Sequence, residues 1–227
     1  MDGAAEDRRT DVVVAVDGPS GAGKSSVSRS VARRLRLRYL DTGSMYRALT
    51  WWMLEHGVDV HDGGAVAAVS HKPELEVGTD PTAPTITVDG VDVAGPIRSD
   101  RVTSAVSAVS AVPEVRARLV QLQRRAIGSG GIVVEGRDIG TTVVPDADLK
   151  VFLTASEEAR AARRAAEHSD PDPEATRVDQ ARRDRLDSAR PASPLRRADD
   201  AVVVDATDLT LDDVVEQVVR LVAERTR

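Results

Sequence analysis

A glycine-rich segment near the amino terminus has the residue types and spacing of a phosphate-binding loop. Residues 18–25 read Gly-Pro-Ser-Gly-Ala-Gly-Lys-Ser and satisfy the P-loop pattern G-x-x-x-x-G-K-[ST] at every fixed position. Glycines let the backbone turn tightly, so successive N–H groups point inward and bind phosphate oxygens. Lys24 supplies a mobile positive charge for the outer phosphates, and the Ser25 hydroxyl can bind Mg²⁺.

The residues on both sides of this loop support a nucleoside triphosphate site. Residues 12–16 form a short apolar, β-branched run, as expected for a buried strand. After the loop, Val27, Val31 and Leu35 recur at helical spacing, and the positive end of such a helix points at the same anion. The predicted triphosphate-binding residues are Gly18, Pro19, Ser20, Gly21, Ala22, Gly23, Lys24, Ser25 and Ser26.

Three further polar clusters follow predicted strands, at residues 41–47, 135–138 and 166–197. In a parallel sheet, ligands bind outside the carboxyl ends of the strands. Arg47, Arg137 and Arg190 would form a second anion site facing the P-loop if they converged there. Two facing phosphate sites suggest phosphoryl transfer between nucleotides, which requires positioning and charge neutralisation and no general base.

The elements that must position these clusters alternate between strand and helix. Apolar runs at 39–40, 131–135, 149–153 and 201–204 predict strands, and each precedes a helical pattern. We expect helices at about 42–56, capped by Thr42 or Ser44, at 99–127 with an interruption near Pro113, and at 210–224. This alternation predicts an α/β fold with a parallel sheet covered by helices on both faces.

Residues 73–98 have the pattern of a small antiparallel insertion. Residues 75–77 and 85–88 alternate as exposed strands do, Asp89-Gly90 is a hairpin turn signal, and 91–93 is the return strand. The predicted organisation is therefore a flexible tail at 1–10, a core at 11–72 and 99–227, and this insertion.

The charged segment 166–197 has two interpretations. A charge run taken alone is most often a solvated surface helix. In a P-loop protein, a polar helical hairpin at about 168–195, with His168, Pro171 and Pro173 in its first turn, would instead be a lid that closes over phosphates.

Composition excludes several classes of protein. The chain has 227 residues, no cysteine and a net charge of −6, which suits one sizeable domain without disulfides or thiolate metal sites. Bulk attraction to nucleic acid is not expected, because the chain is acidic and has few aromatic residues for base stacking. We find neither a signal peptide nor a membrane span, so we expect a cytoplasmic protein. The four histidines lack metal-ligand spacing.

Three segments, in the correct order, resemble the signature segments of bacterial cytidylate kinases: residues 41–47, 136–141 and 183–195. The resemblance covers residues 11–223. It implies a P-loop nucleoside monophosphate kinase fold with a five-stranded parallel core, a monophosphate-binding insertion and a short helical lid. It also implies a monomer that transfers the γ-phosphate of ATP to CMP, and to dCMP, with Mg²⁺.

The resemblance implies roles for individual residues of this chain. The candidate catalytic residues are Lys24, Arg137, Arg183 and Arg190. The candidate CMP-binding residues are Thr42, Tyr46, Arg47, Ser107, Arg116, Arg137, Asp138, Asp187 and Arg190. Among them, Ser107, Arg116 and Asp138 are expected to recognise cytosine, whose amino donor and ring acceptors complement a carboxylate and an arginine. Asp187 and Arg183 are expected to approach the ribose.

The metal ligands and the acceptor stay open at this point. Ser25 is a candidate Mg²⁺ ligand, although the family is variable at this position, and Asp41 is either a helix cap or a ligand to Mg²⁺-bound water. Another kinase of the same fold, of the adenylate or shikimate type, is the alternative enzyme. A GTPase with an Asn-Lys-x-Asp box is excluded because the chain contains no asparagine.

Overall fold

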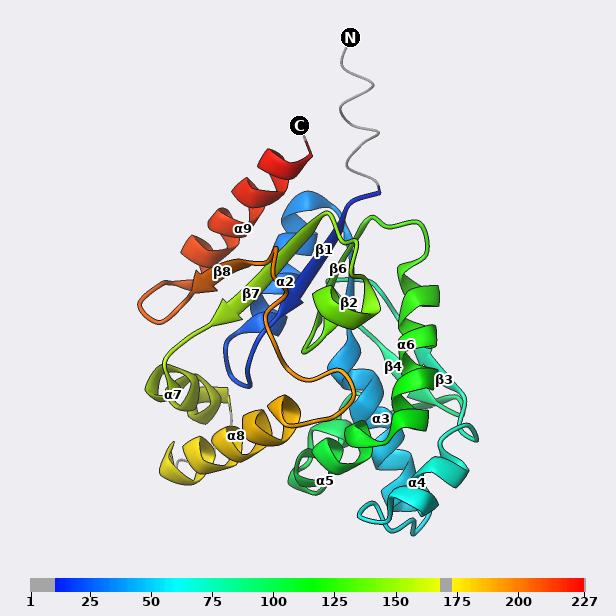
Figure 1. The fold of residues 1–227 in the computed structure, drawn as a ribbon. Helices are drawn as coiled ribbons and strands as arrows, with labels where there is room; N and C mark the ends of the chain where they lie inside the picture. The colour runs from blue at the N-terminus through cyan, green and yellow to red at the C-terminus, as the bar shows by residue number, and fades with distance from the viewer. Residues whose placement is uncertain (1–10, 168–172, 227) are drawn as a thin grey trace. The chain divides into compact units, whose positions relative to one another are not determined.

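The computed structural model describes residues 11–167 and 173–226 (Figure 1). The predicted tail at 1–10 lies outside the described residues, as do His168 and Pro171 of the predicted lid. The chain divides into two compact units, Met1–Tyr39 with Ser129–Arg227 as the first and Leu40–Gly128 as the second. No helix in the described part of the chain is long and apolar enough to cross a bilayer.

The first unit is built on a parallel sheet in the order β2-β6-β1-β7-β8, of which only the last two residues of β2 belong to the second unit. Its strands are β1 (Val13–Asp17), β2 (Arg38–Asp41), β6 (Ile132–Gly136), β7 (Leu149–Thr154) and β8 (Val202–Asp205). Strand β1 pairs in parallel with β6 and β7, and β7 pairs in parallel with β8. The valine runs of β1 and β6 are buried throughout their centres, as parallel strands covered on both faces require. The predicted five-stranded parallel sheet is confirmed among the described residues.

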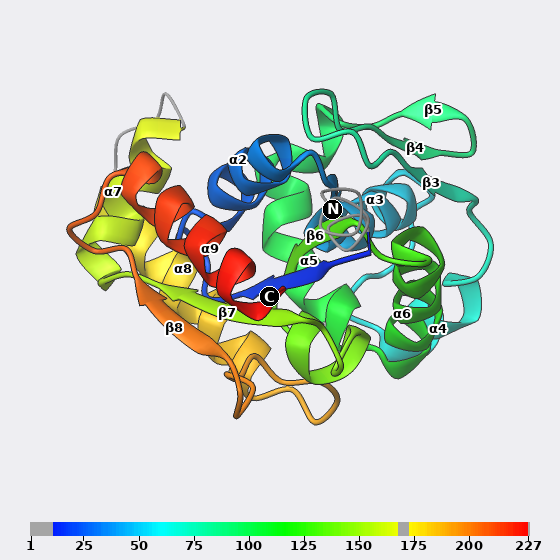
Figure 2. The ribbon, with the colours of Figure 1, turned by 90° about the horizontal axis from the view of Figure 1, so that it is seen from above.

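Helices flank this sheet on both faces. The helices α2 (Lys24–Leu35) and α9 (Leu211–Arg225) pack on one another over one face, with Val27, Val31, Val214 and Val218 in the shared core. A π-helical turn, η2 (Ile139–Val143), lies on the opposite face (Figures 1 and 2). Helix α9 begins with a capping box between Thr210 and Asp213, which satisfies its first N–H groups.

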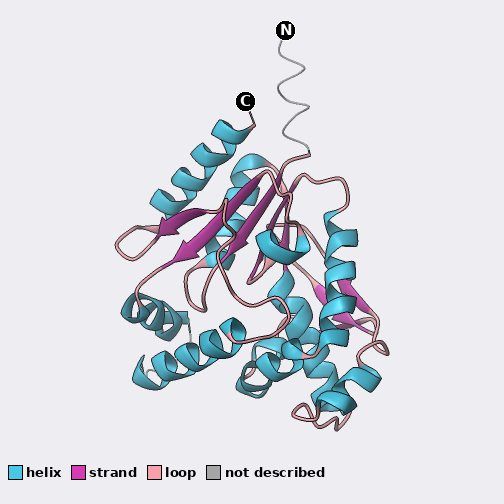
Figure 3. Ribbon diagram, viewed as in Figure 1, coloured by secondary structure: helices cyan, strands magenta, loops and turns pink. Residues whose placement is uncertain are grey.

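Two polar helices of the same unit lie beyond the carboxyl ends of β1 and β7 (Figure 3). They are α7 (Glu157–Glu167) and α8 (Pro173–Ser188), and they pack against each other. Gln180, Asp187 and Arg190 are buried at or just beyond α8, whereas Arg182 and Arg185 are exposed. The interpretation of this segment as a wholly solvated helix is therefore wrong, because one face is packed.

The second unit surrounds α3 (Thr42–Glu55). It also contains α4 (Gly63–Val69), η1 (Pro96–Arg98), α5 (Asp100–Ala111) and α6 (Pro113–Ile127). Its antiparallel sheet consists of β3 (Leu75–Val77), β4 (Ile86–Val88) and β5 (Val91–Asp92), as predicted. The expected cap of α3 by Thr42 or Ser44 is wrong, whereas the alternative role of Asp41 as a helix cap is confirmed, since its carboxylate accepts the Ser44 N–H at 2.9 Å.

A buried carboxylate joins β1 to η2. Asp17 ends β1 with only 5% of its surface exposed. Its Oδ1 accepts the N–H of Ile139 and its Oδ2 accepts the N–H of Gly140, both at 2.8 Å. Burial raises the pKa of Asp17 to about 6, although the two N–H groups act in the opposite direction.

This raised pKa predicts a pH-dependent contribution to stability. The folded state binds a proton at Asp17 below about pH 6, whereas the unfolded chain does so only near 3.8. The stability that protonation of Asp17 provides is therefore present at about pH 4 and is lost as the pH rises through about 6. Relative to Asp17→Asn, we expect the wild type to gain about 2–3 kcal/mol in free energy of unfolding between pH 7 and pH 4.

Urea unfolding of both proteins at several pH values measures this difference. Asp146→Asn, at an exposed position on the loop after η2, is the control and should follow the wild type at every pH. A stability difference between wild type and Asp17→Asn that stays constant with pH would contradict the prediction.

Candidate active site

The P-loop adopts a backbone that depends on glycine at two positions. Gly18 and Gly21 have φ values of 152° and 75°. A Cβ atom at Gly18 would lie 2.0 Å from the Leu153 carbonyl oxygen, and one at Gly21 would lie 2.5 Å from Gln180 Nε2. Gly23, with φ of 91°, is the N-cap of α2. The loop therefore leads directly into the amino end of α2. Backbone N–H groups and the positive end of the helix dipole lie together there, and this arrangement binds phosphate.

Lys24 is the first residue of α2, and its Nζ donates to the Pro19 carbonyl oxygen at 2.8 Å. Desolvation, followed by the nearby Arg137 guanidinium, lowers the pKa of Lys24 well below its usual range. An anionic ligand at the loop would favour the charged ammonium group. Ser25 and Ser26 are exposed on the first turn of α2.

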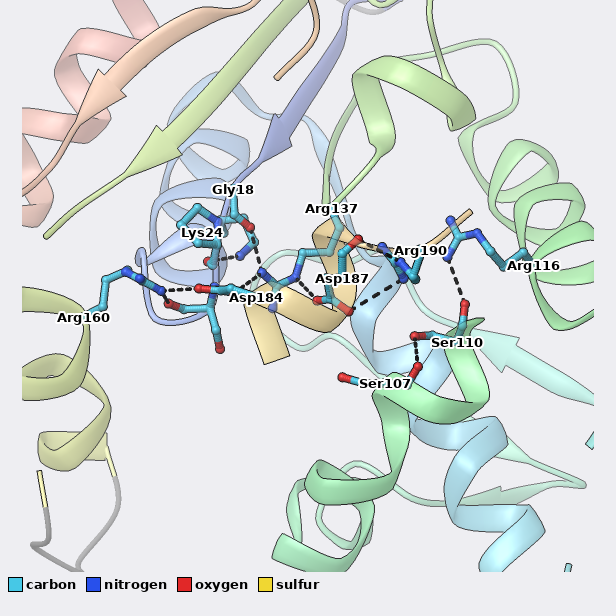
Figure 4. Close-up of polar contacts among 12 residues, drawn as sticks. Gly18, Lys24, Ser107, Ser110, Arg116, Arg137, Arg160, Asp184, Asp187 and Arg190 are labelled. Atoms are coloured by element: carbon cyan, nitrogen blue, oxygen red, sulfur yellow. Dashed lines mark hydrogen bonds and ion pairs between the residues drawn. The ribbon is translucent and has the colours of Figure 1, made fainter. Parts of the chain in front are cut away.

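Arg137 lies against the P-loop and is held by carboxylates of α8 (Figure 4). Its Nη1 donates to the Gly18 carbonyl oxygen at 3.2 Å and to Asp184 Oδ1 at 3.0 Å. Its Nε lies 3.3 Å from Asp187 Oδ2. Arg190 contacts the same residue, with Nε donating to the Asp187 carbonyl oxygen at 3.2 Å and Nη1 lying 3.8 Å from Oδ1. The structure thus brings Arg137, Asp187 and Arg190 together beside the P-loop.

Three acidic or basic residues of this cluster were missed by sequence reasoning. Asp184 and Arg160 form an ion pair at 2.5 Å between α8 and α7, and Asp17 anchors η2. The available signal was the spacing of Gln180, Asp184 and Asp187, which places them on one face of a helix. Arg160 stands in an alanine- and arginine-rich helix, and nothing in its local sequence distinguishes it from Arg163.

Asp138 and Arg183 are the remaining predicted site residues of the first unit. Asp138 follows β6, immediately before η2, and is 5% exposed. Arg183 is half-buried on α8. Glu135, at the end of β6, is buried and accepts a hydrogen bond from the Tyr39 hydroxyl.

In the second unit, the predicted residues form a polar cluster around α3. The Arg116 guanidinium carbon lies 5.4 Å from the centre of the Tyr46 ring, and Nη1 donates to the Ser110 carbonyl oxygen at 3.3 Å. The Ser110 hydroxyl donates in turn to the Ser107 carbonyl oxygen (Figure 4). Arg47 Nη2 is paired with Asp41 Oδ2 at 3.0 Å, and Thr42 is buried.

The predicted convergence of Arg47 with Arg137 and Arg190 concerns residues of different units and stays a prediction. Within the second unit, Tyr46, Ser107 and Arg116 form a buried group that pairs a cation with an aromatic ring. A cation beside an aromatic ring, together with a carboxylate on the other side of the ligand, is suited to bind a planar base with polar edges.

The candidate metal ligands fit Mg²⁺ to different degrees. Among the described residues, no three His, Cys, Asp or Glu side chains gather as a metal site. The exposed Ser25 hydroxyl beside Lys24 suits Mg²⁺ that arrives with a nucleotide and keeps most of its water ligands. Asp41 already accepts hydrogen bonds from Ser44 and Arg47, so its role as a ligand through water stays a prediction.

Known proteins resemble this chain over nearly its whole length. The cytidylate kinase family model matches residues 14–224. A cytidylate kinase from Streptomyces avermitilis is 63% identical over 216 residues, which cover 94% of each chain. One from Rhodococcus opacus is 55% identical over 220 residues, covering 95% of this chain and 96% of the relative.

A crystal structure of an uncharacterized protein from Eubacterium ventriosum shares the fold, with a TM-score of 0.53 and 9% identity. The alignment covers 94% of this chain and 99% of that protein. At this identity the likeness concerns the fold alone, whereas the family match and the two sequence relatives concern the protein as a whole. The chain therefore belongs to the cytidylate kinase family, and it is an enzyme of the nucleoside monophosphate kinase class.

Proposed function

We propose that this enzyme transfers the γ-phosphate of ATP to CMP, and to dCMP, giving ADP and the corresponding diphosphate. The observation that carries this proposal is a complete P-loop, bordered by Arg137 and Arg190, in a chain that matches the cytidylate kinase family over residues 14–224. The relatives' names supply CMP as the expected acceptor.

On the donor side, residues 18–26 hold the phosphates of ATP. The N–H groups of the loop and the amino end of α2 bind phosphate oxygens, and Lys24 exchanges its bond to the Pro19 carbonyl oxygen for the outer phosphates. Ser25 would hold Mg²⁺ together with the nucleotide, and the bound ion would supply charge neutralisation at the phosphates. Exclusion of water by α8 strengthens each of these electrostatic interactions.

On the acceptor side, the phosphate of CMP is held by Arg47, Arg137 and Arg190. Ser107, Arg116 and Asp138 recognise cytosine, and Thr42 and Tyr46 line the same site. Cytosine presents an amino donor beside the ring N3, so a carboxylate and an arginine can pair with it side by side. Uracil would present an acceptor oxygen to the carboxylate instead, which penalises UMP. Asp187 and Arg183 approach the ribose.

The reaction itself requires little covalent chemistry from the side chains of the protein. The phosphate of CMP is already an anionic nucleophile, so no side chain must remove a proton. Lys24 and the guanidinium groups of Arg137, Arg183 and Arg190 stabilise charge on the transferring group while the two nucleotides are held in line.

The choice of acceptor tests the proposed reaction. With ATP and Mg²⁺, ADP release should be strong with CMP and dCMP and at least about 10-fold weaker with UMP, AMP, GMP or shikimate, offered one at a time. A coupled assay of ADP measures this directly. Turnover confined to another acceptor would overturn the CMP assignment, and no turnover with any acceptor would overturn the kinase proposal.

Lys24→Ala tests the donor site. We expect turnover to fall by about 100- to 1000-fold, because the substitution removes a charge that stabilises the transferring phosphoryl group. The melting temperature should stay near that of the wild type, since Lys24 is held with its pKa lowered and contributes little to folding. Lys72→Ala, at an exposed lysine, is the control. A fall in turnover that merely tracks unfolding would contradict this role.

Asp138→Ala tests cytosine recognition. The substitution should lower kcat/KM for CMP by about 10- to 100-fold and narrow the preference for CMP over UMP, while KM for ATP changes by less than about threefold. Steady-state kinetics with CMP and UMP provide the measurement, and Asp146→Ala at an exposed site is the control. An unchanged ratio of kcat/KM for CMP to kcat/KM for UMP would show that Asp138 does not recognise the base.

A further inference from the structure

The carboxylate of Asp184 gathers hydrogen-bond donors from three different elements. Its Oδ1 accepts the Ser20 N–H of the P-loop at 2.9 Å and Nη1 of Arg137, which follows β6, at 3.0 Å. Its Oδ2 accepts Nη1 of Arg160, on α7, at 2.5 Å. Asp184 itself belongs to α8, so a single side chain ties four segments of the first unit together (Figure 4).

Asp184 is well suited to stay ionised in this position. The charges of Arg137 and Arg160, with the Ser20 N–H, lower the pKa of its carboxyl group below the usual range, even though burial acts in the opposite direction as the largest single influence. Charge-assisted bonds of this kind are stronger than neutral ones and fix their partners more tightly.

Arg160 and the P-loop backbone fix the carboxylate. Arg160 is 7% exposed, and its Nη1 also donates to the Ser20 carbonyl oxygen at 2.8 Å. Ser20 therefore contributes its N–H to Asp184 and its carbonyl oxygen to Arg160. This closed set of bonds leaves the Asp184 side chain little freedom to rotate away from the loop.

The fixed carboxylate in turn orients Arg137. Asp184 binds Nη1, and Asp187, on the same face of α8, lies 3.3 Å from Nε. Two carboxylates on one helix thus set the plane of the guanidinium group. Among the described residues, Nη2 of Arg137 has no hydrogen-bonding partner, so it is the nitrogen available to a phosphate oxygen.

A purely stabilising role accounts poorly for this network. Buried ion pairs are weak evidence for stability, because desolvation of the charges offsets much of their attraction. A packed apolar contact between α8 and the P-loop would join these elements at least as well. What the carboxylate adds is a defined direction for Arg137, and misplacement of a catalytic group by about 1 Å can cost about 100-fold in rate.

We propose that Asp184 is a positioning residue for phosphoryl transfer, which orients the Arg137 guanidinium at the P-loop through a carboxylate anchored by Ser20 and Arg160. The proposal rests on the function proposed above, because it gives Arg137 its role toward the phosphates. Asp184 itself touches neither nucleotide in this scheme and acts through Arg137.

A double-mutant cycle tests the proposal. Asp184→Asn keeps the shape of the side chain and removes its charge, and we expect kcat to fall by about 10- to 100-fold while KM for CMP changes by less than about threefold. In an Arg137→Lys background, where no guanidinium group remains to be oriented, the same substitution should lower kcat by less than about threefold. Asp179→Asn, at an aspartate of α8 whose side chain is 41% exposed and pairs with Arg182, is the matched control.

Equal effects of Asp184→Asn in the two backgrounds would overturn the proposal, because they would show that Asp184 acts independently of Arg137. If Asp184→Asn does not unfold cooperatively near the wild-type melting temperature, Asp184→Glu takes its place in the cycle. This variant keeps the charge and displaces it by one methylene group, so the same non-additivity is expected.

A second readout separates this proposal from the proposed function. Hydrogen exchange at the Arg137 Nε–H, followed by NMR without nucleotide, should be at least about fivefold faster in Asp184→Asn than in the wild type. Wild type that does not phosphorylate CMP would refute the proposed function, and the exchange rates would still decide whether Asp184 restrains Arg137. Equal rates in the two proteins would overturn the inference.

Discussion

The first unit depends on one electrostatic constraint. The positively charged side chains at the carboxyl end of β1 must be paired with acidic groups or with hydrogen-bond acceptors. Lys24 and Arg137 lie near one another there, Arg160 is joined to Arg137 through Asp184, and water is partly excluded from these side chains. Unpaired charges in such a place would cost several kcal/mol each. Asp184 and Glu135 are among the acidic groups that offset them, and backbone carbonyl oxygens of the P-loop accept one hydrogen bond from each of the three side chains.

The way in which these positive charges are paired also prepares the site to bind an anionic ligand. Lys24 is bonded to a loop carbonyl oxygen and has a lowered pKa, so a phosphate group offers it a stronger partner than the protein does. Arg137, in contrast, is held by two carboxylates through Nη1 and Nε, and in the proposed mechanism its Nη2 binds the ligand. The site thus combines a cation that can move with a cation that is fixed, and phosphoryl transfer benefits from both.

Much of the architecture was predictable because its signals are local. The valine runs of β1 and β6, the P-loop pattern and the Asp89-Gly90 turn each depend on neighbours in the sequence, and the strands and hairpin formed where they were expected. The sequence left the cap of α3 open among three neighbouring residues. Thr42, Ser44 and Asp41 all have capping side chains, and only the backbone direction at the end of β2 selected Asp41.

The sequence by itself determined the phosphate-binding loop, the parallel sheet and the family, because fixed spacing and hydrophobic periodicity encode them. Only the tertiary structure revealed that Asp184 and Arg160 meet at Ser20, more than 130 residues away along the chain, and that Asp17 holds η2. Charged residues on a polar helix look alike in sequence. Their roles are decided by which of them face a buried partner, and that depends on how α7 and α8 pack beside the P-loop.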